Sequence, residues 1–234
     1  MTLALVSSTP APTRPTLHIE IDVDFVCPWC LIGKRHLDGA VRRFNALVPD
    51  VRVETSWRSR ELLPDTPLEG LDYEDFCIRR LGSAEAVAWR RLQVKEAGRA
   101  AGVQFQFDRI RRLPNTARAH ALLARARAAG EPALPARFVD RILTAYFVEG
   151  KDIGDPVVVE RLARACGLPK AAPDPTADQR SAGRDDRSRP GTGGVPFFVF
   201  DRTHALTGAG SVASLLEAML HGWQGRAARG LYRA

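Results

Sequence analysis

The chain has 234 residues and a formal net charge of +7, with 45% hydrophobic and 26% charged residues, values typical of a globular protein that buries a sizeable core. No apolar run approaches the roughly 18–20 residues that cross a bilayer, which excludes an integral membrane protein. Four cysteines are too few for a disulfide scaffold. The basic residues are almost all arginines spread along the chain, and only 7% of the residues are aromatic, so the charge predicts no nucleic-acid partner.

The first residues carry neither a basic start nor an apolar stretch of the roughly 7–15 residues found in secretory signals. A Ser/Thr/Pro-rich stretch follows, so we expect a disordered leader over residues 1–16. Without an export signal, the expected compartment is the cytoplasm. There a transient, catalytic disulfide is expected rather than a permanent one.

A strand, a helix and a second strand are predicted next. Residues 17–26 alternate apolar and polar side chains, which is the pattern of a β-strand. A helical stripe follows, with Leu37, Ala40 and Phe44 at spacings of three to four residues. Residues 51–57 then alternate as a second strand. This order is typical of the start of a parallel α/β unit.

The middle of the chain predicts a series of helices. One helix carries Tyr73 and Cys77 and ends at Gly82, and another is capped by Thr116. Two more are expected near residues 138–147 and 155–166.

The C-terminal part returns to strands after a proline-rich stretch, 169–189, that we expect to be loosely ordered. Strands at 195–200 and 204–207 and a last helix from Ser211 complete a β-α-β, helical block, β-β-α order. We therefore predict an α/β thioredoxin-like fold. Residues 17–57 and 190–224 form its discontinuous domain, and residues 58–189 form an inserted helical domain.

The chemistry concentrates in Cys27-Pro28-Trp29-Cys30, directly after the first strand. Pro28 suits the first position of a helix, so Cys27 is expected at the helix start, where free amide groups and the helix dipole stabilise a thiolate. Cys30 lies one turn further on, within reach of a disulfide. Such a dithiol carries out thiol–disulfide exchange, in which the outer thiolate attacks and the inner one resolves.

A structural zinc site is the alternative for a Cys-x-x-Cys pair. It needs a second pair of ligands, but Cys77 and Cys166 stand far apart in the sequence and the five histidines have no matching spacing. We therefore expect no metal. Both single cysteines fall on apolar helical faces and are interpreted as buried, inert thiols.

A proline opens the buried strand that follows Gly193-Gly194. Because proline cannot donate to a strand ladder, Val195-Pro196 marks a special backbone site. Together with CPWC, the GVPFFV stretch closely resembles the DsbA family of thioredoxin-like oxidoreductases, and within it the FrnE-like branch related to 2-hydroxychromene-2-carboxylate isomerases. The resemblance covers about residues 17–222. Its further matching stretches are Leu113-Pro114-Asn115-Thr116 with Ala119-His120, residues 145–153, and Thr207-Gly208-Ala209.

The resemblance implies a cis Val195–Pro196 bond in a loop that faces the dithiol. It also implies that Cys27 attacks, that Cys30 resolves, and that Val195 pairs with an extended substrate segment in the manner of strand addition. Trp29 is expected to shape the exposed redox surface, beside Pro28. Where the family tends to have an aromatic residue this chain has Arg60, which implies a more polar groove edge.

Three further polar residues leave two interpretations open. Asp24 relays a proton or belongs to the polar face of the strand, and we favour the structural interpretation because a carboxylate opposes a lowered thiol pKa. Asn115 and His120 approach the dithiol from the helical block, or they serve in capping and packing.

The predicted function is thiol–disulfide oxidoreduction on disulfide- or thiol-containing proteins or small molecules, with the dithiol as the only redox group and no cofactor. One alternative is a glutathione-dependent isomerase or transferase on the same fold, although such relatives typically place serine where Cys27 stands. The other is a non-catalytic thioredoxin-like binding module.

Overall fold

A computed structural model describes residues 14–169 and 194–228 of the chain. Its central sheet has four strands in the order β2-β1-β5-β6: β1 (Thr16–Val23), β2 (Arg52–Ser59), β5 (Phe197–Phe200) and β6 (His204–Thr207). β1 and β2 are parallel, while β5 and β6 run antiparallel to their neighbours. The β-α-β and β-β-α halves thus share one sheet, which confirms the predicted thioredoxin-like fold.

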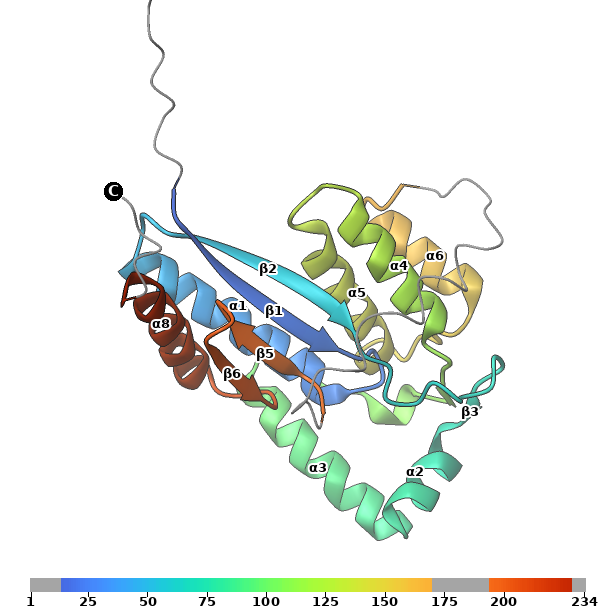
Figure 1. The fold of residues 1–234 in the computed structure, drawn as a ribbon. Coiled ribbons are helices and arrows are strands. Elements are labelled where there is room, and N and C mark those ends of the chain that lie inside the picture. Colours follow the sequence, from blue (N-terminus) through green and yellow to red (C-terminus); the bar gives the residue numbers. More distant parts are fainter. Residues whose placement is uncertain (1–13, 170–193, 229–234) are drawn as a thin grey trace, which may run out of the picture.

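The apolar residues that alternate along β1 form part of the main hydrophobic core. Leu17, Ile19, Ile21 and Val23 are fully buried. They share one face of the sheet because side chains alternate in a strand. Helices α1 (Pro28–Leu47) and α8 (Val212–Ala228) contact each other, and α8 lies beside β5 and β6 at the left of Figure 1. Their packing fixes where α1 begins relative to the edge of the sheet.

The inserted segment forms a helical block beside the sheet (Figure 1). It contains α2 (Tyr73–Leu81), α3 (Ala84–Ala100), α4 (Ala117–Ala128), α5 (Leu134–Phe147) and α6 (Pro156–Ala165). A short 3-10 turn at Phe107–Arg109 and a two-strand ladder of β3 (Leu71–Asp72) and β4 (Arg112–Leu113) connect these helices.

The block shares its core with the sheet. Phe25, directly after β1, packs edge-to-face on Phe138 of α5 with ring centroids 6.0 Å apart. Both rings are fully buried, so the segment that leads into the dithiol is held against the helical block.

Most predicted elements are confirmed, with three differences. The first strand ends at Val23, so Asp24 lies in the following turn and is not on the strand's polar face. Thr116 occupies the N-cap position of α4 but its side chain makes no capping bond. The expected leader extends too far, because Thr16 already belongs to β1, and residues 1–13 lie outside the described residues.

The proline-rich stretch lies almost wholly outside the described residues, so its expected loose order stays a prediction, as do the domain boundaries. Among the residues that the structure describes, no helix is both long and apolar enough to cross a membrane.

Candidate functional site

Cys27 occupies the N-cap of α1. Its backbone is extended (φ −96°, ψ 110°), and Pro28 follows at the first helical position, which needs no N–H donor. The first turn of α1 carries no acidic residue. The free amides of the helix start are therefore available to a thiolate at Cys27, without a competing carboxylate in that turn.

Cys30 lies in the first turn of α1, and its N–H donates to the Cys27 carbonyl at 3.0 Å. Its side chain is fully buried, whereas Cys27 keeps 6% exposure. Burial raises the pKa of the Cys30 thiol well above its ordinary value, and the neighbouring Cys27 raises it further. Neither cysteine forms a disulfide in this structure. The pair is thus asymmetric, with an outer thiol that keeps slight exposure and an inner thiol that is fully buried and has a raised pKa.

The loop before β5 faces the outer thiol. The Val195–Pro196 bond is cis, and the Cys27 Sγ–H donates to the Val195 carbonyl at 3.4 Å. Val195 is half-buried and Pro196 is buried. The sequence separates these residues by more than 160 positions, and the sheet brings them together.

Helix α1 contacts this loop and also the turn between β6 and α8, residues 208–211. Gly33 faces the loop so closely that a Cβ there would meet Pro196 Cγ at 2.9 Å and the Cα of Ala209 at 3.3 Å. His36 donates from Nδ1 to the Gly210 carbonyl at 2.6 Å. Helix α1 therefore carries the thiols at its start, packs against the opposing loop at Gly33, and binds the turn before α8 through His36.

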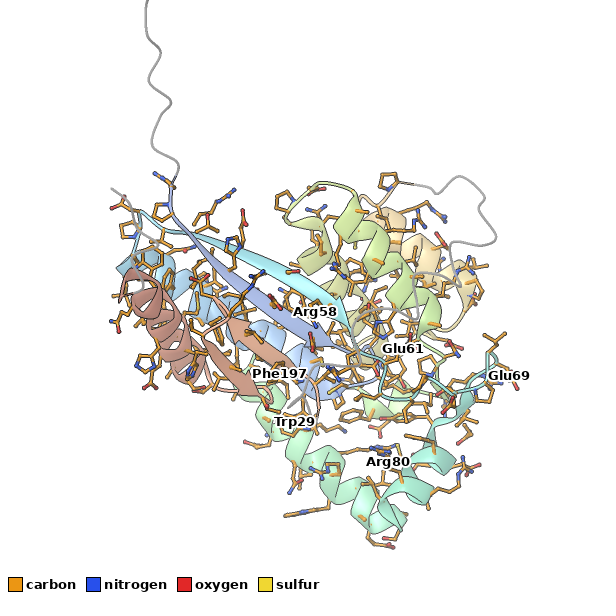
Figure 2. The ribbon with its side chains drawn as sticks, in the orientation of Figure 1. Trp29, Arg58, Glu61, Glu69, Arg80 and Phe197 are labelled. Atoms are coloured by element: carbon orange, nitrogen blue, oxygen red, sulfur yellow. The ribbon has the colours of Figure 1, made fainter. Side chains whose placement is uncertain are left out.

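Trp29 and Pro28 are both half-buried at the start of α1. Figure 2 shows Trp29 in the lower middle of the view, near the labelled Phe197 of β5. Arg60 donates from both Nε and Nη2 to Asp22 at 3.3 Å. Asp22 also pairs with Arg58, so Arg60 shares this carboxylate at the end of β2.

Asp24 is fully buried three residues before Cys27. Its Oδ2 accepts from the Leu62 N–H at 2.6 Å, and its Oδ1 accepts from His120 Nε2 at 3.2 Å and from Thr116 Oγ1 at 3.4 Å. The weaker Val26 N–H bond adds a fourth donor at 3.4 Å. The interpretation of Asp24 as part of a polar strand face is therefore wrong.

The helical block supplies two of those donors. Thr116 uses its hydroxyl on Asp24 instead of capping α4. His120, on the next turn of α4, is buried and its ring lies 4.8 Å from that of Phe25. Asn115, by contrast, bonds the Thr66 carbonyl and the Ala117 N–H, which agrees with the capping interpretation.

The remaining cysteines lie outside this site. Cys166 is buried at the end of α6, as predicted. Cys77 is only half-buried, which corrects the expectation of a buried thiol, and burial still raises its pKa. Within the described ranges, no three His, Cys, Asp or Glu side chains gather as metal ligands would.

Several features of the site had no assigned role in the sequence. Gly33 and His36 fall inside or beside the stretch that carries the family resemblance, but no spacing rule predicts that Gly33 contacts Pro196 or that His36 binds Gly210 in the turn after β6. The Leu62 N–H also escaped prediction, because a backbone donor carries no residue-type signal.

A four-stranded sheet, a thiol pair at a helix start and an opposing cis-proline loop define a protein of the thioredoxin-fold class with a helical insertion. Residues 18–220 match the DSBA-like thioredoxin domain, and the chain belongs to that family.

Three known proteins are similar to this chain. The chain is 27% identical over 157 residues to the uncharacterized protein YwbO of Bacillus subtilis, covering 67% of this chain and 70% of that protein. A probable DsbA oxidoreductase of Streptomyces coelicolor superposes with a TM-score of 0.75 at 25% identity, covering 90% of this chain and 91% of the other. The cytosolic disulfide reductase DsbM of Pseudomonas aeruginosa shares the fold, with a TM-score of 0.56, 20% identity and coverage of 92% and 98%.

Proposed function

We propose that this protein is a thiol–disulfide oxidoreductase in which Cys27 attacks and Cys30 resolves. One observation carries the proposal: the outer thiol sits at a helix N-cap against the Val195 carbonyl, while the inner thiol is buried one turn away. Family membership supports the reaction class.

In the reducing direction, the Cys27 thiolate attacks one sulfur of a substrate disulfide, and the other substrate sulfur leaves as a thiolate that takes up a proton. Cys30 then loses its proton and attacks the Cys27 sulfur. The Cys27–Cys30 disulfide forms as the mixed disulfide breaks, and the second substrate thiol is released. The substrate gains two electrons and the dithiol loses them, and the oxidising direction is the reverse.

The loop at Val195–Pro196 supports a disulfide held in an extended segment. The half-buried Val195 backbone lies opposite Cys27, where a substrate strand can pair with it. Trp29 is half-buried two residues after Cys27, which supports a role in shaping this substrate surface. Disulfide- or thiol-containing proteins and small molecules are the proposed substrates, and the dithiol needs no cofactor.

The test compares wild type, Cys27→Ser, Cys30→Ser and the matched control Cys77→Ser. Reduction of a disulfide-bonded peptide by the dithiothreitol-regenerated protein is followed by mass spectrometry. We expect loss of activity in Cys27→Ser, a trapped mixed disulfide in Cys30→Ser, and wild-type activity in Cys77→Ser. Wild-type activity in Cys27→Ser contradicts the proposal, and a glutathione-dependent isomerisation that survives this substitution favours the isomerase alternative.

A further inference from the structure

The sheet is open along one side of β2. Among the residues that the structure describes, β2 lies at an edge of the sheet and pairs with β1 alone. The Arg52 N–H donates to the Pro15 carbonyl at 2.8 Å, and the Arg60 N–H donates to the Val23 carbonyl at 2.9 Å. Peptide groups of successive residues in a strand point to opposite sides, so the even-numbered residues of β2 bond to β1. The odd-numbered residues direct their N–H and C=O groups away from it.

Val53 and Thr55 carry these outward peptide groups in the first half of β2. Within the described ranges, neither N–H has an acceptor and neither carbonyl has a donor. Helices α4 and α5 contact β2, and Figure 1 shows that they meet its arrowhead while its start lies away from the helical block. A row of free N–H and C=O groups at a sheet edge is a template for another strand.

A cavity of about 640 Å³ adjoins this edge. Its walls come from α1, from β2 and from the start of α5. Its apolar lining includes Leu37, Val41, Val53, Trp57, Pro132 and Ala136. The volume lies in the range of ligand sites, roughly 300–1,000 Å³. Because Val53 and Thr55 both line the cavity, a strand paired with them turns alternate side chains toward the same space.

One positive charge at this cavity has no partner. Asp38 accepts from Lys34 Nζ at 2.6 Å, and Arg52 pairs with Glu54. Arg42 is exposed and forms no hydrogen bond or ion pair with any described residue. Helix α1 leads from the end of β1 back to the start of β2, so Arg42, near the end of the helix, lies toward the start of β2. The cavity therefore combines an apolar space with a free guanidinium that suits a carboxylate.

We propose that the edge of β2 and this cavity form a second peptide-binding site, which takes an extended segment carrying an apolar side chain and, two residues later, a carboxylate. The segment adds antiparallel to β2, the more stable of the two pairings, and exchanges N–H···O=C bonds with Thr55 and Val53. Its apolar side chain lies opposite Thr55 and fills the cavity. Its carboxylate lies opposite Val53 and binds Arg42.

This site is separate from the dithiol. Strand β1 lies between β2 and β5, and the Val195–Pro196 loop precedes β5. A segment bound along the outer edge of β2 therefore leaves the loop opposite Cys27 open. The protein can hold a partner protein by this edge while the dithiol meets a substrate, and the site does not depend on the proposed exchange.

The test uses the peptide acetyl-Thr-Val-Thr-Leu-Thr-Glu-Thr-amide and two matched probes. One has glutamine in place of glutamate. The other has N-methyl leucine, which cannot donate to the Thr55 carbonyl. Each probe is added to isotope-labelled, reduced protein up to about 5 mM, because a single short strand binds weakly, and NMR follows the amide signals.

We expect the first probe to shift the amide signals of Val53 and Thr55. The glutamine probe should bind about two- to fivefold more weakly, the effect of one exposed ion pair. The N-methyl probe should bind about fivefold more weakly or less tightly still, the effect of one hydrogen bond.

Two substitutions at the cavity have matched controls nearby. Ala133→Trp puts an indole into the cavity and should weaken the first probe about tenfold or more, because the leucine side chain loses its burial. Ala129→Trp, also exposed but outside the lining, should leave binding unchanged. Arg42→Gln should abolish the preference for the glutamate probe over the glutamine probe, and Arg43→Gln should keep it.

Three results would overturn the proposal: no shift at Val53 and Thr55, equal binding of the N-methyl probe, or unchanged binding in Ala133→Trp. The titration of wild type needs no variant, so it decides the matter even where a variant does not fold. Reduction of a disulfide-bonded peptide, which uses the dithiol, checks the fold of each variant.

Other occupants of the edge give distinct results. A dimer in sedimentation that dissociates in Val53→Pro, which removes only an outward N–H, places a second copy of the chain on β2. Octanoate that shifts the cavity signals where the peptide does not places a small carboxylate there. Either result replaces the peptide and contradicts the proposal.

Discussion

Gly33 provides the sharpest test of how α1 holds the loop opposite Cys27. A Cβ added at this position would meet Pro196 Cγ at 2.9 Å, Phe198 Cζ at 3.2 Å and Ala209 Cα at 3.3 Å. Phe198 is fully buried, Ala209 presents backbone, and the Gly208 N–H holds the Pro196 carbonyl at 2.8 Å. None of these neighbours is the free end of a flexible side chain, so Gly33→Ala must shift the loop or the helix.

The magnitude follows from two opposing effects. Alanine is favoured over glycine inside a helix by about 0.8–1.0 kcal/mol. Overpacking a filled core costs about 1–3 kcal/mol. Gly39 lies on the same helix, and its added Cβ would meet mainly the side-chain methyl groups of Val212, at 3.0 and 3.4 Å. Gly39→Ala therefore gains the same helix propensity as Gly33→Ala but has a smaller steric cost, so it is the matched control.

Urea unfolding at neutral pH, with reductant present, measures the difference. We expect Gly33→Ala to be less stable than Gly39→Ala by about 1–3 kcal/mol, equivalent to roughly 2–10 °C in Tm for a chain of this size. Reduction of a peptide disulfide should slow about fivefold in Gly33→Ala alone, the value of one hydrogen bond to the displaced Val195 backbone. Gly33→Ala at least as stable as Gly39→Ala would refute the reasoning.

Three further predictions test other parts of the molecule. Because the folded pKa of Cys30 is raised, its contribution to stability is complete below the unfolded thiol value of about 8.5 and is lost as pH rises through the folded value. Reduced wild type should therefore lose stability faster than Cys30→Ala above about pH 9, by at most about 1.4 kcal/mol per pH unit in urea titrations, and parallel curves would contradict this. Asp155→Ala removes the N-cap that accepts from the Val157 N–H at 2.7 Å and should cost about 1 kcal/mol in chemical unfolding, whereas no change would remove the cap's assigned role. Tyr146→Phe leaves the Arg112 carbonyl without its 3.1 Å donor and should cost about 1–2 kcal/mol by the same measurement, with an unaltered midpoint as the contrary result.

The sequence predicted the sheet and the dithiol because local rules determine both. Period-two alternation located β1, and a proline at the first helical position located the start of α1 at Cys27. Glycine after a helical stripe located the end of α2, where Gly82 adopts φ 97°. No separate helix was predicted for α3, because its apolar residues do not form a clear stripe on one face. Only Val87, Val94 and Gly98 are buried along its 17 residues.

The cis-proline loop needed more than local rules. A proline at a strand start indicates a special backbone position, but its placement against Cys27 depends on β5 pairing with β1. That pairing joins segments about 180 residues apart in the sequence. The position of the loop opposite Cys27 was therefore predicted from the family resemblance and not from the spacing of residues.

Asp24 shows why the polar part of the site was harder to predict. Alternation assigned it to an exposed strand face, but the strand ends one residue earlier and the side chain turns inward. Burying a carboxylate is costly unless donors surround it, and here the donors are Thr116, His120 and two backbone N–H groups. A backbone N–H donor cannot be recognised from residue type, and α4 contacts Asp24 only in the folded chain. The sequence therefore shows that Asp24, Thr116 and His120 are present but not that they bind one another. Two of those donors belong to α4, so the helical insertion completes the polar surroundings of a carboxylate that lies three residues before Cys27.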